Sequence, residues 1–281
     1  MSQPQKNAAA DGLLQQLEQE LAQRQLEMPL LPDVAAEVLS STLDDKTNAA
    51  RLAELIQQDQ ALASHLLRVV NSAAFRGSTE IVALQQALAR LGMERIREIA
   101  LSVSLQGTLF TKGPFDGLLQ QTWQASLRTA LWSKEIARQA RKNVEVAYLC
   151  GLLHNVGVPV LVGRLTRMEQ VPTEAQVNSV LDQLTTAAGI ALAEEWSLPS
   201  SVTMTIRFLD DFSAAQNAQD LVAVIDAGKA FAEAEEDPAS DELTGDLLLL
   251  DSVQHLNFYP DDVEQLLALG EHIEMTVAGM T

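Results

Sequence analysis

Residues 147–157 read AYLCGLLHNVG and form the most informative stretch of the sequence. The run from Ala147 to Leu153 is almost uniformly apolar, and it is followed by the polar pair His154-Asn155 and then by Gly157. Uniform apolarity over a helical length is typical of a helix buried on all sides. We therefore expect a central buried helix over 144–154 that ends in a histidine.

Helical spacing continues on both sides of this stretch. Apolar residues recur at intervals of three and four in Leu13–Leu26, and a longer helix is expected over 118–141. A helix over 81–91 should end at Gly92, because glycine adopts the left-handed conformation after a helix at little cost. No strand-like alternation is convincing, and the sequence predicts an all-α fold.

A turn cluster at Thr111-Lys-Gly-Pro114 divides this helical pattern. We expect two helical lobes, one over 13–110 and one over 115–281. The second lobe includes an acidic extension, and residues 1–12 are expected to be a disordered terminus.

Composition excludes several classes of protein. The 281 residues are 47% hydrophobic and carry a formal net charge of −19, which disfavours broad nucleic-acid binding. Cys150 is the only cysteine, so no intrachain disulfide can form. The N-terminus lacks the apolar run of a signal peptide, and no uninterrupted apolar run approaches a membrane span. We expect a soluble, cytoplasmic protein that binds no membrane.

Charge is distributed unevenly along the chain. Residues 93–142 hold eight basic and four acidic side chains, whereas residues 210–246 hold eleven acidic side chains and one lysine. The acidic stretch is either a solvated surface or a surface that meets a basic partner, and the sequence does not separate the two.

Several separated motifs resemble the HDOD family, the HD-related output domains of bacterial signalling proteins. The N-terminal half carries MPLLP at 28–32, LAELIQQD at 52–59, LLRVVNS at 66–72 and IVALQQALARLG at 81–92. The C-terminal half carries the segment 123–130, GLLHNVG at 151–157 and GIALAEEWSLP at 189–199. The resemblance runs from about residue 24 to 212 and implies a two-lobe helical bundle with a degenerate HD-like C-terminal lobe.

The resemblance also implies where the metal ligands of HD enzymes would lie. Their first histidine falls near Ala125 and Ser126, their His-Asp pair falls at His154-Asn155, and later histidines fall at Thr185 and at about Leu209 and Asp210. Their last aspartate corresponds to Asp226. Only His154 and Asp226 remain as donors, which is too few for a metal site, so the resemblance implies vestigial positions, no cofactor and no catalysis.

The main hypothesis is therefore a non-catalytic regulatory protein that binds a signalling protein or a small anionic signal. Its input would come from a separate molecule, and a homo-oligomer is compatible with the sequence. One alternative is a metal-dependent phosphohydrolase that uses His154, Asp226 and Asp210 in a rearranged site. Another is a purely structural helical adaptor without a ligand pocket.

The locally basic stretch between the predicted lobes supplies the candidate contacts for an anionic ligand or acidic partner. Pockets favour such interfaces between two rigid walls. The candidate residues are Arg95, Arg97, Arg128 and Lys134. The alternative is that these cations pair with the chain's own excess of carboxylates.

Three further features have structural interpretations. Cys150 is expected to be an inert buried thiol, because it lies within the apolar helix. Asn71 and Ser72 are expected to hydrogen-bond local backbone. Thr173 and Gln176 have the spacing of a helix-capping box.

Overall fold

The computed structural model describes residues 3–43, 49–75, 77, 79–110, 113–236 and 243–281. In that part of the chain every regular element is a helix, which confirms the predicted all-α class. The helices are α1 (Gln3–Ala22), α2 (Asp33–Leu43), α3 (Ala49–Gln58), α4 (Gln60–Val70), α5 (Leu84–Leu109), α6 (Asp116–Gln139), α7 (Val144–Leu153), α8 (Gly157–Thr166), α9 (Glu174–Glu195), α10 (Ser200–Phe208), the 3₁₀ helix η1 (Phe212–Ala218), α11 (Gln219–Glu236), α12 (Leu243–Leu248), α13 (Asp251–His255), α14 (Pro260–Leu267) and α15 (Gly270–Met280).

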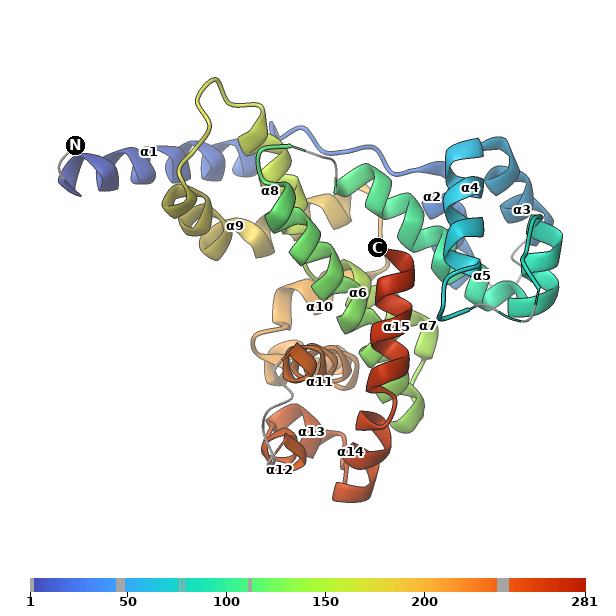
Figure 1. Ribbon diagram of the computed structural model, residues 1–281. Coiled ribbons are helices and arrows are strands. Elements are labelled where there is room, and N and C mark those ends of the chain that lie inside the picture. The colour runs from blue at the N-terminus through green and yellow to red at the C-terminus, as the bar shows by residue number, and fades with distance from the viewer. Residues whose placement is uncertain (1–2, 44–48, 76, 78, 111–112, 237–242) are drawn as a thin grey trace.

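The helices α2–α5 lie together at one side of the molecule, on the right in Figure 1. Gly92 interrupts α5 with φ 78° and ψ 169°, a conformation that is open to glycine alone. This confirms that the helix begun after Ile81 ends at Gly92. The part of α5 that follows the interruption faces α7.

The long helix α6 is the centre of the other half and packs most extensively against α7 and α11. The side chains Trp132 of α6 and Phe231 of α11 meet with ring centroids 5.1 Å apart. The predicted buried helix is confirmed as α7, since every residue from Ala147 to Leu153 is buried. The predicted capping box of α9 is confirmed as well, at Thr173 and Gln176.

The segment Val144–Thr166, which includes α7 and α8, is long and apolar enough by composition to cross a membrane. Its most apolar window is, however, 78% buried inside the protein. A core helix passes the same test of length and hydropathy, and this burial favours that interpretation.

The helix α1 lies along α9, on the left in Figure 1, far from α2, which follows it in sequence. Leu13 and Leu17 are buried there. The Glu20 carboxylate accepts hydrogen bonds of 2.8 and 2.7 Å from Arg164 of α8. The helix begins at Gln3, whereas the sequence predicts disorder up to residue 12; the run of three alanines at 8–10 has high helix propensity.

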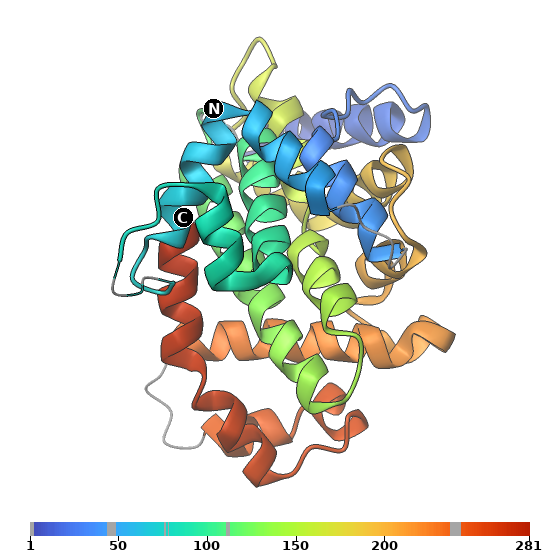
Figure 2. The same ribbon diagram turned by 90° about the vertical axis from the view of Figure 1, so that its right-hand side faces the viewer.

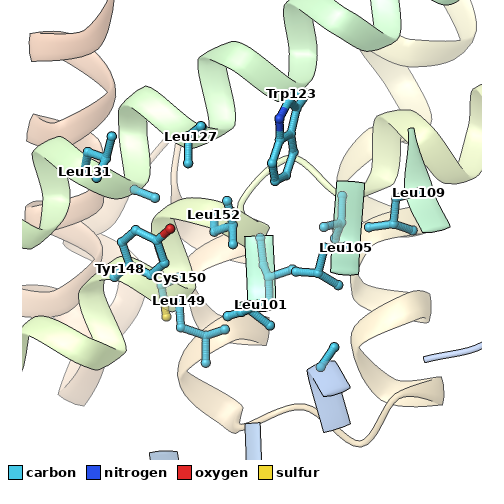
Figure 3. Packing of buried hydrophobic residues seen from close by; sticks show 14 of the residues in the cluster. Leu101, Leu105, Leu109, Trp123, Leu127, Leu131, Tyr148, Leu149, Cys150 and Leu152 are labelled. Atoms are coloured by element: carbon cyan, nitrogen blue, oxygen red, sulfur yellow. The ribbon is translucent and has the colours of Figure 1, made fainter. Parts of the chain in front are cut away.

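One large buried cluster contains side chains from both predicted lobes. Figure 2 shows the same helices turned by 90°, with α15 alongside α5 and α6. Figure 3 shows how leucines of α5 and α6 gather around α7 within this cluster. The predicted boundary at Thr111–Pro114 falls partly outside the described residues.

Candidate functional site

The C-terminal end of α7, which we call the motif end, holds the pair His154-Asn155. The His154 Nδ1 lies 2.7 Å from the Gly151 carbonyl oxygen. A carbonyl oxygen can only accept, so Nδ1 carries the proton and Nε2 carries the lone pair. Burial lowers the pKa of His154 to about 4, and the nearby Lys229 charge acts in the same direction. The histidine is therefore neutral at physiological pH.

The remaining positions implied by the HD resemblance supply few ligands around His154. Ala125 is exposed on the outer face of α6, whereas Ser126 is buried. The Thr185 hydroxyl donates to the Leu181 carbonyl at 2.7 Å. Leu209 is apolar and Asp210 is exposed. Burial raises the pKa of the Asp226 carboxyl, which favours its neutral form.

Close backbone packing marks the motif end. A Cβ placed on Gly157, the first residue of α8, would lie 1.9 Å from the Thr185 carbonyl oxygen of α9. Real Cβ contacts are never that short, so only glycine fits at this crossing. The helices α8 and α9 thus meet backbone to backbone beside the position where the HD resemblance implies a metal ligand.

These residues do not fit a metal ion. Within the described ranges, no group of three or more His, Cys, Asp or Glu side chains could hold one. An amide replaces the carboxylate at Asn155, and hard or borderline cations favour several carboxylate or imidazole ligands in one sphere. The residues described at this end of α7 therefore support no metal-assisted step.

The opposite end of α7 borders a small cavity between α2, α5 and α7, which we call the seam cavity. Its volume is about 30 Å³, room for one or two waters. The residues that line it are Val38, Glu94, Arg97, Glu98, Leu101, Glu145, Tyr148 and Leu149. Leu101, Tyr148 and Leu149 are labelled in Figure 3.

A buried ion pair lies behind the seam cavity. The Lys134 ammonium of α6 donates to the Glu98 carboxylate, and the two side chains are 2% and 12% exposed. Burial raises the pKa of Glu98, and the Lys134 charge opposes this rise. The Tyr148 and Ser102 hydroxyls are 2.8 Å apart, so a hydrogen bond also joins α7 to α5.

Three of the four predicted contact residues are engaged by the chain's own carboxylates. Lys134 is buried against Glu98, and an Arg95 nitrogen lies 3.8 Å from the same carboxylate. Arg128 makes two hydrogen bonds, of 2.5 and 3.1 Å, to Glu274 of α15. The cations at 128 and 134 are therefore not available to an external anion without breaking an internal pair.

Arg97 differs from the other three. Its Nε is buried without a hydrogen-bond partner among the described residues, and no carboxylate there lies within ion-pair distance of its guanidinium. Arg97 is thus an unpaired, partly buried cation in a chain with a formal net charge of −19. In this respect it differs from the other three predicted contact residues, which are all engaged by carboxylates.

Sequence reasoning missed the acidic and aromatic neighbours of Arg97. Glu94, Glu98 and Leu101 follow the three- and four-residue spacing that places side chains on one helix face, and this spacing was available in the sequence. Tyr148 belongs to a helix remote in sequence, and no local pattern brings it to α5.

The other polar predictions are confirmed for Asn71 and Cys150 but not for Ser72, whose buried hydroxyl has no hydrogen-bond partner among the described residues. The Asn71 side chain donates to the carbonyls of Leu67 and Ile81 and accepts from the Ile81 N–H, which is a local structural role. Cys150 is fully buried, and burial raises its pKa to about 11. Such a thiol is not a nucleophile at neutral pH.

Solved structures share this fold. An HDOD domain protein of unknown function from Geobacter sulfurreducens superposes with a TM-score of 0.72 at 22% identity, covering 94% of this chain and 98% of that one. A protein from Shewanella amazonensis SB2B, provisionally named a phosphohydrolase, gives 0.71 at 21% identity with the same coverage. A protein from Marinobacter aquaeolei VT8, provisionally named a signal transduction protein, gives 0.61 at 21% identity, covering 91% of this chain and 60% of that one. At these identities the likeness shows the fold alone.

Sequence comparison identifies the family. An uncharacterized protein of Treponema pallidum is 30% identical over 200 residues, which is 67% of this chain and 38% of that relative's length. The sequence pattern of the HDOD domain matches residues 28–212, about two-thirds of the chain, and includes both the seam cavity and the HNVG motif of α7. The chain therefore belongs to the HDOD domain family.

Proposed function

We propose that this chain is a regulatory protein of bacterial signal transduction that acts by binding another molecule and catalyses no reaction. The observation that carries the proposal is the donor set at the motif end. Asn155, Ala125 and Thr185 stand where the HD resemblance implies ligands, and the Thr185 hydroxyl is already engaged by backbone. Loss of these donors removes the means of lowering the pKa of a bound water.

The same proposal places the protein in the cytoplasm and gives it a partner protein or a small anionic molecule as its ligand. The strongly negative net charge disfavours nucleic acid as that ligand. The membership in the HDOD family and the fold shared with a protein provisionally named for signal transduction support this class of function.

Hydrolysis assays test the absence of catalysis. We expect protein loaded with Mn²⁺ or Fe²⁺ to cleave neither p-nitrophenyl phosphate nor bis(p-nitrophenyl) phosphate above the protein-free rate. Asn155→Asp should be equally inactive, because the positions at 125, 185 and 209 still supply no imidazole.

Metal analysis separates this proposal from the phosphohydrolase alternative. Turnover that disappears in His154→Ala, together with stoichiometric Fe, Mn or Zn in the wild type that is absent from His154→Ala, would overturn the proposal in favour of a rearranged metal site. A matched His65→Ala variant controls for loss of a histidine elsewhere, since His65 lies on α4.

A further inference from the structure

Arg97 is the feature of the molecule that the proposed function leaves unexplained. Arginine presents five N–H donors and no acceptor, and in folded proteins a partly buried guanidinium is normally paired. Its buried Nε has no partner among the described residues, although the chain holds twice as many acidic as basic side chains. Arg97 lines the seam cavity, so an anion bound there would meet its guanidinium and supply the missing negative charge.

The size of the seam cavity limits the anion. About 30 Å³ holds a water or two, which is comparable to the space of one small functional group. The group must therefore be the end of a ligand whose remainder stays outside, or a very small acid.

The surrounding charges favour a singly charged anion over a doubly charged one. Glu94 and Glu145 lie exposed at the cavity, and Glu98 lies within it. These carboxylates would repel a doubly charged phosphate more strongly than a single negative charge. A carboxylate also matches the fork formed by two N–H groups of one guanidinium.

The apolar part of the lining favours a carboxylate on a hydrocarbon stem. The wall includes the side chains of Val38, Leu101 and Leu149, together with Tyr148. Such walls would stabilise the methylene group next to the carboxylate in proportion to the apolar area removed from water.

We propose that the seam cavity is a subsite for one carboxylate group borne on an aliphatic stem, with Arg97 as its anchor. This inference rests on the proposed function, since it names the chemical group of the molecule that such a regulator would bind. Two sources present that chemistry, a short free fatty acid and a glutamate side chain of a partner protein.

Ligand-observed NMR tests the subsite with two probes. The first is butyrate, and the second is a capped peptide with one glutamate flanked by leucines, compared with the same peptide carrying glutamine. We expect saturable binding of at least one carboxylate probe to wild-type protein. The glutamine peptide should bind about tenfold more weakly than its glutamate counterpart if the source is a partner protein.

Variants assign the binding to Arg97. Arg97→Gln should weaken carboxylate binding about tenfold or more, because a charge-assisted bidentate contact is lost. Arg207→Gln is the matched control: it removes an exposed arginine of α10 that does not line the seam cavity, and it should bind nearly as wild type. Arg97→Lys keeps the positive charge but not the two adjacent N–H donors, so it should bind the carboxylate probe at an intermediate level. This variant provides a second test if Arg97→Gln does not fold.

Three results would overturn the subsite: no saturable binding of either carboxylate probe, equal binding by wild type and Arg97→Gln, or tighter binding of inorganic phosphate than of butyrate. Tighter binding of butyrate than of the peptide identifies a free acid as the source, and the reverse identifies a protein. None of these outcomes depends on hydrolysis, so failure of the subsite and failure of the non-catalytic proposal are distinguishable.

Discussion

The two ends of α7 have opposite chemical characters. At the motif end, His154 is neutral and its neighbours Asn155 and Thr185 are uncharged. At the seam end, an ion pair and an unpaired arginine lie at the cavity beside Tyr148. The helix that carries the HD-like motif thus lies beside a buried ion pair at the seam, whereas its own polar residues at the motif are neutral and the nearby charge is that of Lys229 on α11. The segment that resembles a catalytic motif marks a close helix crossing at Gly157. The candidate binding site is marked instead by the unpaired charge of Arg97.

The largest expected effect comes from breaking the ion pair at the seam end. Lys134→Met leaves the Glu98 carboxyl buried without its cation and should lower the free energy of unfolding by about 4 kcal/mol. Chemical denaturation measures this change. The double variant Lys134→Met, Glu98→Leu removes both charges and should recover most of the loss; a double variant as unstable as the single one would show that packing, and not charge, holds this seam.

The motif end should respond to added volume. Gly157→Ala forces a methyl group onto the Thr185 carbonyl and should destabilise the protein by about 3 kcal/mol, as overpacking at rigid backbone does. Gly163→Ala in the same helix is the control, because nothing lies within 4 Å of its added Cβ. That variant should gain up to about 1 kcal/mol from helix propensity. Equal midpoints for the two variants in urea would contradict the close crossing of α8 and α9.

A smaller effect follows from the neutral histidine. Burial lowers the pKa of His154 from 6.5 to about 4, so the unfolded chain binds more protons between these pH values. The free energy of unfolding should therefore fall as pH falls from 6.5 towards 4. Since His154 is not fully buried, we expect a loss of about 1 kcal/mol at pH 5 relative to pH 7.

The variant His154→Gln isolates this contribution from the carboxyls of Glu98 and Asp226, whose raised pKa values act in the opposite direction. The stability difference between wild type and His154→Gln, measured by denaturation at pH 7 and pH 5, should shift against the wild type as pH falls. A difference that is independent of pH would mean that the ring is not held neutral.

The smallest effect is expected at Arg97. Since its guanidinium makes no internal pair among the described residues, Arg97→Gln should change the free energy of unfolding by no more than about 0.5 kcal/mol. Arg128→Gln should cost more, because Arg128 is hydrogen-bonded to Glu274. Thermal denaturation of the two variants measures this difference. A larger loss of stability for Arg97→Gln than for Arg128→Gln would contradict the absence of an internal pair at Arg97.

The sequence predicted the fold well where a few neighbouring residues determine the local structure. Uniform apolarity located α7, and Gly92 located the interruption of α5, because each rests on a short stretch of chain. The sequence did not fix which residue of α6 corresponds to the first histidine of HD enzymes. Neighbouring residues of a helix point about 100° apart, and here Ala125 is exposed whereas Ser126 is buried.

The pairing of the seam cations was beyond local pattern. The sequence offered four equivalent cations as contacts for an anion. Which of them is available depends on the carboxylate that each one meets in the fold. Glu274 is 146 residues from Arg128, and Glu98 is 36 residues from Lys134. Contacts over such separations depend on the packing of whole helices, and only the fold distinguishes Arg97 from its neighbours.

The docking of α1 has a consequence for the order in which the protein forms. Glu20 finds Arg164 across 144 residues of sequence, and the Trp196 indole donates to the Pro29 carbonyl across 167. At a synthesis rate of about 5–20 residues per second, α1 leaves the ribosome roughly 7 to 30 s before its partner segments exist. During that interval Leu13 and Leu17 have no groove to enter. The helix α1 is thus made well before the helix it packs against, and a nascent chain stalled before α9 would leave the apolar face of α1 exposed.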